Sequence, residues 1–264
     1  MRKNRADGMK MTSFFFLTSQ TSSLQPIDEL FMFLNYLALG PELRDLAERF
    51  RVQQSTVSQI ISTWSSFLYA VLGSVRIWIP EEKLREYLPA EFKEFADTAV
   101  ILDSTELRCQ HPSSPFLQTK VSSAYKSCYT MKGLFGVAPH GAVTFISPLY
   151  AGSISDKQML LNSGILSLLS PGMAIMAGHG FLTDDVVPCK IYWPAFLSGR
   201  SQRSDCEVSE TQAIARLRVH VEQLVQRVKD HKLFNTEIPP QLFGCINQLH
   251  SVACLLINYD NSQV

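Results

Sequence analysis

The stretch from residue 98 to residue 103 constrains the fold more than any other part of the chain. It reads Thr-Ala-Val-Ile-Leu-Asp, an apolar run that ends in the carboxylate of Asp103 and gives way to a polar segment at 104–106. An unbroken apolar run of this length is typical of a strand buried on both faces of a sheet. A carboxylate at the end of such a strand is held rigidly at the rim of the sheet, where a metal or substrate can bind. The sequence therefore predicts a layered sheet with a functional group at Asp103.

Further strand and helix signals follow this run in a definite order. A turn signal, Ala-Pro-His-Gly, lies at 138–141. The elements expected after residue 104 are a loop at 105–125, strands at 126–138 and 142–150, a helix with a polar start at 156–169, a buried strand at 173–177, an irregular segment at 180–208, and helices at 209–232 and 241–258. Strand, hairpin, helix, strand and a later helix is the order of an RNase H-like α/β domain, a mixed sheet with flanking helices.

The segment before this domain has helical periodicity. Apolar residues recur at helical spacing through 27–72, with a break at Gly40-Pro41. A short helix, a turn at 51–54 and a longer helix that opens with small polar residues is the helix-turn-helix pattern, with Ser55 predicted as the N-cap. The side chains that would then face a DNA groove are Gln54, Ser55, Thr56, Ser58 and Gln59. A plain helical bundle with the same core is the alternative, because the third helix has no Lys or Arg to anchor phosphates.

Composition narrows the class of protein. The 264 residues include 24 basic and 24 acidic ones, so any nucleic-acid-binding surface must be local. Six cysteines without a C-x-x-C pair make a zinc site or disulfide framework unexpected and favour reduced thiols in the cytosol or nucleus. No apolar run reaches the roughly 18 residues that span a bilayer, so no membrane association is expected. Four regions are predicted: a flexible tail at 1–25, a small all-α helix-turn-helix-like module at 26–79, a connector at 80–97 and the RNase H-like domain at 98–258.

Two carboxylates stand where metal-dependent chemistry would need them. In an RNase H-like domain three acids from separate elements hold two Mg²⁺ ions, which act on a phosphodiester. Asp103 ends the first strand and Glu222 lies in the long helix, but Gly178 follows the next buried strand where an acid is expected. Simpler roles remain open: Asp103 as a strand cap, Glu222 as the ion-pair partner of Arg218 four residues earlier, and Asp156 as a helix N-cap.

Several short runs along the chain together resemble one family. They are Ile-Leu-Asp-Ser-Thr-Glu at 101–106, Ser-Ser-Ala-Tyr-Lys at 122–126, Lys-Gly-Leu at 132–134, Gly-Ser-Ile-Ser-Asp at 152–156, Gly-Phe-Leu at 180–182 and Arg-Val-His-Val-Glu at 218–222. With the helix-turn-helix runs at 46–50 and 56–58, they resemble the PIF/Harbinger-type DDE transposases and their DDE superfamily-4 domain. The resemblance extends from about Asp28 to Asn258.

The resemblance implies that Asp103 is the first catalytic acid and Glu222 the last, with a divalent metal cation, Mg²⁺ or Mn²⁺, as cofactor. The family's second acid lies in an Ala-Asp-Lys-Gly-Phe motif; here residues 177–181 read Ala-Gly-His-Gly-Phe, so Gly178 stands at the position of a lost ligand. Asp156 matches another recurrent family acid, as a ligand or a cap. The side chains that could replace the lost ligand are His179, Asp184 and Asp185. Since losing one member of a catalytic unit costs several orders of magnitude in rate, efficient catalysis is not expected.

Further contacts to DNA are expected from Lys126, Lys132 and Arg218, unless these side chains belong to an ordinary solvated face. Gln59 stands where the family often has Arg, which weakens the expected DNA binding. The expected partners are DNA, bound weakly or through a separate DNA-binding protein, and a second copy of the chain in a homo-oligomer. The expected location is the nucleus and also the cytoplasm. Two functions remain open: an impaired metal-dependent nuclease of the transposase type, and a non-catalytic remnant that binds DNA or a partner protein. A purely structural module is a third.

Overall fold

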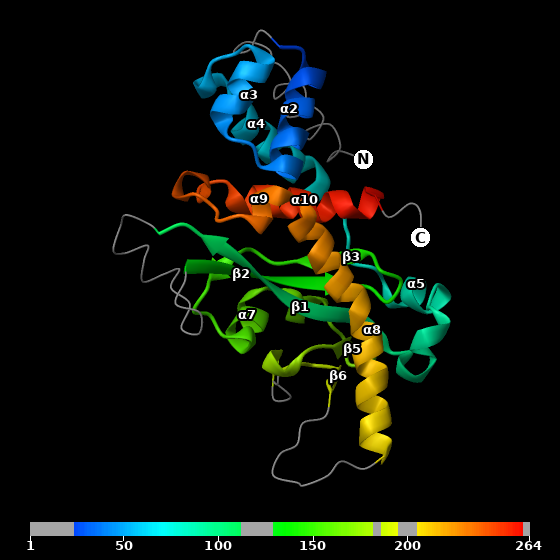
Figure 1. The fold of residues 1–264 in the computed structure, drawn as a ribbon. Coiled ribbons are helices and arrows are strands. Elements are labelled where there is room, and N and C mark those ends of the chain that lie inside the picture. Colours follow the sequence, from blue (N-terminus) through cyan, green and yellow to red (C-terminus); the bar gives the residue numbers. More distant parts are fainter. Residues whose placement is uncertain (1–23, 112–128, 182–185, 195–204, 261–264) are drawn as a thin grey trace. The chain divides into compact units, whose positions relative to one another are not determined.

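The computed structural model describes residues 24–111, 129–181, 186–194 and 205–260 (Figure 1). The described chain divides into two compact units. We call residues 24–75 with 229–253 the helical unit, and residues 76–228 with 254–260 the sheet unit. None of the helices in these ranges combines the length and the apolar composition that crossing a membrane requires.

Three helices form the N-terminal part of the helical unit: α2 (Pro26–Leu39), α3 (Leu43–Phe50) and α4 (Gln54–Gly73). The apolar stripes of α3 and α4 are buried as the helical spacing predicted. In α2 the buried apolar residues are Met32, Phe33, Tyr36 and Leu37, and the prediction that Phe31 and Leu34 belong to this face is wrong, because both are exposed. α2 ends at Gly40, which adopts a left-handed conformation with φ 59° and donates its backbone N–H to the carbonyl of Tyr36. Glycine is suited to this position because it has no Cβ to clash at positive φ. The break expected at Gly40-Pro41 is therefore confirmed.

The turn between α3 and α4 is tighter than predicted. Arg51 ends α3 in a left-handed conformation, and only Val52 and Gln53 separate it from α4. Gln53 is the N-cap residue, in extended conformation and without a side-chain cap. The prediction of Ser55 as N-cap is therefore wrong: Ser55 is the second residue of α4, because the left-handed residue reverses the chain in fewer residues than expected.

Residues 229–253 pack with the N-terminal helices, although their sequence pattern placed them in the α/β domain. They contain α9 (Lys232–Asn235), the 3₁₀ turn η4 (Pro240–Leu242) and the first half of α10 (Ile246–Asp260). A Cβ at Gly40 would lie 3.1 Å from the backbone nitrogen of Leu233, so the missing side chain allows α9 to approach α2 closely. Leu233 and its neighbour Phe234 are both buried. No periodicity in the sequence could have revealed this long-range return.

The sheet unit is built on one mixed sheet with the strand order β3-β2-β1-β5-β6. Its strands are β1 (Thr98–Cys109), β2 (Tyr129–Val137), β3 (Val143–Ile146), β4 (Tyr150–Ala151), β5 (Ala174–Met176) and β6 (Lys190–Tyr192). β1 pairs antiparallel with β2 and parallel with β5, and β4 pairs with β2. The mixed sheet with flanking helices and a preceding helical module confirms the predicted RNase H-like class.

Three strand predictions need correction. The strand expected at 142–150 is interrupted, because β3 ends at Ile146 and only Tyr150 and Ala151 form β4. β1 does not end at Asp103 but continues to Cys109, so residues 105–109 are strand rather than loop. Alternate residues of this extension, Thr105, Leu107 and Cys109, are buried, and the extension pairs with β2 from Gly133 to Tyr129. β6 lies inside the segment expected to be irregular, and its three residues were too few to give a periodic signal.

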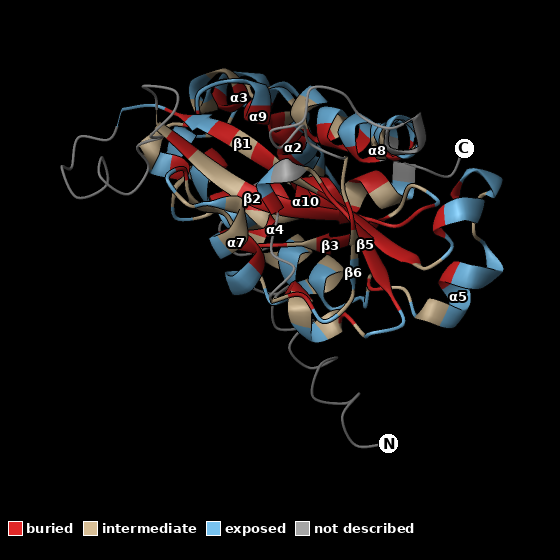
Figure 2. Ribbon diagram, turned by 90° about the horizontal axis from the view of Figure 1, so that it is seen from below, coloured by how far each residue is buried: buried red, intermediate tan, exposed pale blue. Residues whose placement is uncertain are grey.

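Helices cover both faces of this sheet (Figure 1). α7 (Asp156–Asn162) and the 3₁₀ turn η2 (Ile165–Leu168), which Gly164 separates from it at φ 85°, lie on one face. α8 (Asp205–Asp230) crosses the other, with α5 (Glu81–Glu86) and η1 (Ala90–Phe95) preceding the sheet in sequence. The central strands are buried along most of their length (Figure 2).

The edge of the sheet at β3 is closed by the end of α10. The side-chain amide of Asn258 accepts a hydrogen bond from the backbone N–H of Val143 at 2.8 Å and donates one to its carbonyl oxygen at 2.9 Å. The amide thus satisfies backbone groups that an exposed edge strand would leave open to a further strand.

Replacing Gly136 with alanine should destabilise the sheet unit by about 1–3 kcal/mol, since overpacking a dense core forces shifts of this cost. A Cβ at this position of β2 would lie 2.7 Å from Cγ2 of Val100 and 2.8 Å from Cβ of Phe145, both buried. Urea denaturation measures the change. Gly73→Ala in α4, where nothing lies within 4 Å of a new Cβ, is the matched control and should not destabilise the chain. Equal effects of the two substitutions would contradict the steric explanation.

Candidate active site

Asp103 and Gly178 lie at the same level of the sheet. In the parallel pairing of β1 with β5, the last register pair joins Ile101 to Met176. Asp103 and Gly178 each follow that pair by two residues, and Nη2 of Arg218 is 3.5 Å from Oδ1 of Asp103 and 3.3 Å from a Cβ built on Gly178. β5 ends at Met176, whereas β1 continues beyond Asp103. The position predicted for the missing second acid is therefore directly beside the first acid.

Arg218 of α8 lies against both positions. Its Nη2 is 3.5 Å from Oδ1 of Asp103, and the two side chains retain only 17% and 24% of their exposure. A half-buried ion pair of this kind is screened far less than a surface pair. Among the described residues, the ion pair of Arg218 is made with Asp103 and not with Glu222 one helical turn later. The predicted pairing of Glu222 with Arg218 is therefore not observed.

The guanidinium of Arg218 also covers Gly178. A Cβ built on Gly178 would lie 3.3 Å from Nη2, 3.5 Å from Cζ and 3.5 Å from Nη1 of Arg218. The first of these distances is tighter than a relaxed van der Waals contact. A side chain at position 178 would thus begin in direct contact with the cationic end of Arg218.

Asp156 approaches the same region from α7. The N-cap of α7 is Ser155, whose Oγ accepts a hydrogen bond from the backbone N–H of Gln158 at 3.2 Å, so Asp156 is not the cap. A Cβ on Gly180 would lie 2.0 Å from Oδ2 of Asp156, so a side chain there would displace this carboxylate. Oδ1 of Asp156 is buried, with no hydrogen-bond partner in the described part of the chain. The carboxylate is therefore held against the segment that follows β5.

Neighbouring charges act on the ionisation of Asp103. Its pKa is raised from the ordinary aspartate value, mainly because burial penalises the carboxylate. Arg218 and the backbone N–H of Ser104 lower this pKa, while the charges of Glu222 and Asp156 raise it. The three predicted acids are thus close enough to influence one another, and Arg218 is the cation that offsets their charge at Asp103.

These residues do not fit a pair of divalent ions as they stand. Glu222 is exposed on α8, and within the described ranges no group of three His, Cys, Asp or Glu side chains is arranged to hold a metal. A guanidinium, which keeps its charge at all working pH values, lies where an added ligand would have to meet the first acid. The proposed substitutes Asp184 and Asp185, the side chain of His179, and Lys126 lie outside the described residues.

The predicted DNA-facing residues are found at the start of α4. Gln54, Ser55, Ser58 and Gln59 are exposed, and Thr56 is half-buried. The two arginines of α3 pair with acids on the same helix, Arg44 with Glu48 at 3.3 Å and Arg49 with Asp45 at 2.9 Å. Residues 24–75 carry three basic and five acidic side chains, a formal charge of −2. This surface can read hydrogen-bonding groups but attracts phosphates weakly.

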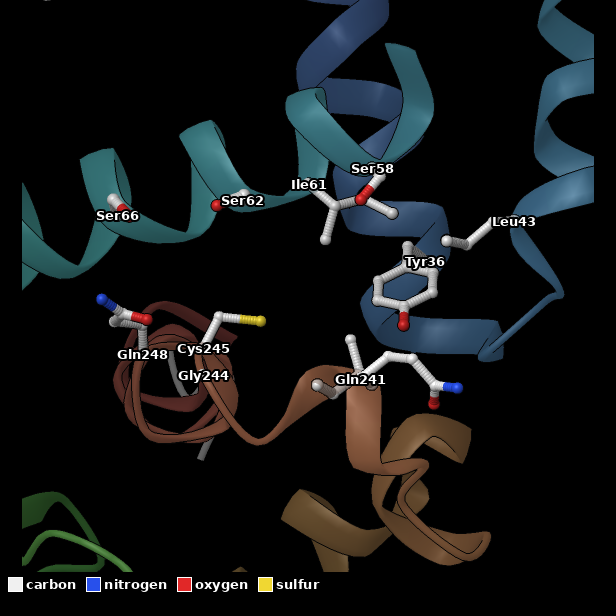
Figure 3. Close-up of a pocket in the computed structure, with 11 residues that line it drawn as sticks. Tyr36, Leu43, Ser58, Ile61, Ser62, Ser66, Gln241, Gly244, Cys245 and Gln248 are labelled. Atoms are coloured by element: carbon white, nitrogen blue, oxygen red, sulfur yellow. The ribbon is translucent and has the colours of Figure 1, made fainter. Parts of the chain in front are cut away.

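A pocket of about 370 Å³ lies beside α4 in the helical unit (Figure 3). Ser58, Ser62 and Ser66 line it from α4, and Cys245 and other residues of 241–248 line it from the C-terminal segment. Burial raises the pKa of the Cys245 thiol and, together with Cys245, raises that of Tyr36 to about 12. The lining is therefore uncharged at neutral pH and does not suit a phosphate. Part of the polar face of α4, at Ser58, belongs to this pocket.

Of the other predicted DNA contacts, Lys132 lies in β2, where its Nζ donates to the carbonyl oxygen of Ile154 at 3.4 Å. Arg218 was named as a DNA contact and as a partner of Glu222, but its pairing with Asp103 was missed. No local pattern in the sequence indicated that pairing, because it joins α8 to β1. The closeness of Asp156 to Gly180 was also missed.

Two family models match the chain. The model described as DDE superfamily endonuclease matches residues 102–258, and the model of the helix-turn-helix of DDE superfamily endonuclease matches residues 22–74. A search of curated proteins finds no match. The first match alone covers more than half of the chain and includes Asp103, Gly178 and Glu222. The chain therefore belongs to the DDE superfamily endonucleases, with the helix-turn-helix module of that family at its N-terminal side.

Proposed function

We propose that this chain is a transposase-derived endonuclease scaffold of the PIF/Harbinger type whose phosphodiester cleavage is impaired. We further propose that it acts by binding DNA, with binding of a partner protein as the alternative. The family chemistry would use Mg²⁺ or Mn²⁺ held by Asp103, a second acid and Glu222, with a two-metal mechanism. The observation that carries the proposal is the pair formed by Gly178 and Arg218: the position of the second acid has no side chain, and a guanidinium lies against it. A cleavage site assembled from two acids and a fixed cation lacks both the ligand and the charge that two dications need.

The native chain should nick supercoiled plasmid DNA no faster than its Glu222→Ala variant, in either Mg²⁺ or Mn²⁺. Removing an acid from a working catalytic unit lowers the rate by several orders of magnitude, whereas removing one from an impaired unit changes little. Rates of conversion to open-circular plasmid at equal protein concentration provide the measurement. Metal-dependent cleavage by the native chain that disappears in Glu222→Ala would show that the site is active and would contradict the proposal.

Binding to DNA through the helix-turn-helix is the function proposed in its place, with protein binding as the alternative. The supporting observation is the exposed polar start of α4, with Gln54, Ser55 and Gln59. We expect dissociation constants of about 10⁻⁶ to 10⁻⁴ M at physiological salt, typical of non-specific binding, since α4 provides no phosphate anchor.

Fluorescence anisotropy with labelled duplex DNA tests this expectation. The double variant Gln54→Ala/Gln59→Ala should weaken binding, while Gln212→Ala, an exposed glutamine of α8, should not. If the native chain does not bind DNA at all, or if both substitutions leave affinity unchanged, the module is not a DNA reader. Its exposed face would then be assigned to a partner protein, and the nuclear location expected for a DNA-binding protein would lose its support.

A further inference from the structure

The Arg218 guanidinium pairs with Asp103, the first of the three acids that a metal site would use. It is 3.5 Å from Asp103, and the charges of Glu222 and Asp156 both act on that same carboxylate. Nε of Arg218 is buried and has no hydrogen-bond partner among the described residues. No acceptor at Nε therefore fixes the orientation of the guanidinium. The observed neighbours of the guanidinium are the Asp103 carboxylate and the open side of Gly178.

We propose that Arg218 is the resident cation of this site, taking the place that a missing acid and its metal would occupy, and that it excludes divalent ions from the native chain. This inference rests on the proposed loss of cleavage and specifies its cause. One guanidinium neutralises Asp103 without requiring the second acid. A dication approaching Asp103 would meet that positive charge within a few ångströms, and like charges repel strongly in a partly buried site.

The same geometry implies that restoring the acid alone is not enough. In a Gly178→Asp variant the new carboxylate would start from a Cβ that is 3.3–3.5 Å from three guanidinium atoms. It would therefore pair with Arg218 rather than remain free for a metal. Two changes are required to open the site: an acid at position 178 and removal of the cation at position 218.

Titration with Mn²⁺, followed by the electron paramagnetic resonance signal of the free ion, tests this requirement. Native chain and Gly178→Asp should show no specific binding or only weak binding. The double variant Gly178→Asp/Arg218→Gln should bind Mn²⁺ at least about tenfold more tightly than Gly178→Asp, a change within the range produced by residues next to metal ligands. Equal affinity of Gly178→Asp with and without Arg218 would overturn the proposal.

Two matched variants separate charge from bulk and position. Gly178→Asn/Arg218→Gln supplies the same bulk at position 178 without the charge and should not bind as the acid-bearing double variant does. Gly178→Asp/Arg216→Gln removes a positive charge from an exposed position of the same helix and should bind no better than Gly178→Asp. If the Arg216 substitution enhanced binding as much as the Arg218 substitution, a general charge effect would explain the result and the proposal would fail.

The native chain gives a test that does not depend on whether any variant folds. At matched ionic strength, its melting temperature with Mn²⁺ and with a chelator should differ by less than about 1 °C, because an ion that does not bind the folded state cannot stabilise it. A larger rise that Asp103→Asn abolishes would show that metal enters despite Arg218. That outcome would overturn this inference while leaving the loss of cleavage intact, whereas native cleavage would refute the proposed function itself.

Discussion

Cleavage of plasmid DNA in Mn²⁺ should appear in the variant Gly178→Asp/Arg218→Gln at a rate at least about a thousandfold above that of the native chain, because a complete catalytic unit contributes several orders of magnitude. The acid restores a ligand at the level of Asp103, as the register of β1 with β5 indicates. Removing the guanidinium frees both carboxylates from a cation that would otherwise pair with them. Nicking of supercoiled plasmid, measured as an initial rate, gives the comparison.

Glu222 provides the control for this gain of activity. Adding Glu222→Ala to the active double variant should abolish cleavage, since the third acid would then be missing. Gly178→Asn/Arg218→Gln should be inactive because it adds bulk without charge. The expectation would be wrong if Gly178→Asp alone cut as fast as the double variant, or if the double variant folded, bound Mn²⁺ and still did not cut.

The second large effect is a loss of stability in acid that arises from His250. This histidine of α10 is fully buried in the helical unit. Its ring lies edge-on to the ring of Phe234, with the two ring centroids 5.8 Å apart. Burial lowers its pKa from the ordinary 6.5 to about 4. Between these two values the unfolded chain therefore binds more protons than the folded one. The stability that His250 contributes is fully present above pH 6.5 and is lost as the pH falls through about 4.

The lost stability amounts to roughly 3 kcal/mol, from about 1.4 kcal/mol for each unit by which the pKa is lowered. That is a large part of the 5–15 kcal/mol by which folded proteins are typically stable.

Urea denaturation at pH 7 and at pH 4.5, followed by tryptophan fluorescence, measures most of this difference. His250→Gln should remove most of it, because glutamine does not titrate. His111→Gln, which changes an exposed histidine, should leave the acid loss unchanged. An equal acid loss in native chain and His250→Gln would assign the effect to other groups.

The predicted site shows how far residue patterns reach. The run at 98–103 and the glycine at position 178 predicted the first acid and a missing second one, and in the structure Nη2 of Arg218 lies near both residues. The strand prediction failed at Asp103 because polar residues at 104 and 106 looked like a loop. In the fold they alternate with Thr105 and Leu107, which are buried against the sheet's neighbours. Burial of alternate residues over so short a run depends on pairing with β2, which the sequence does not display.

In the helical module, too, the sequence predicted the helices but not the contacts between distant segments. Helical spacing predicted α2, α3 and α4, and the absence of Lys and Arg from α4 predicted weak anchoring to phosphate. The sequence could not indicate that Arg44 and Arg49 are engaged with acids on their own helix, nor that residues 229–253 return to this unit. Such contacts join distant segments, or depend on which rotamer a long side chain adopts.

By itself the sequence determined the order of most elements and predicted two retained acids and a missing second one, because periodicity and residue type are local properties. The tertiary structure alone decided the position of Arg218. That position depends on two distances, from α8 to Asp103 of β1 and from α8 to Gly178 in the segment after β5. A glycine in the sequence shows only that a side chain is absent; packing decides which neighbouring side chain occupies the space.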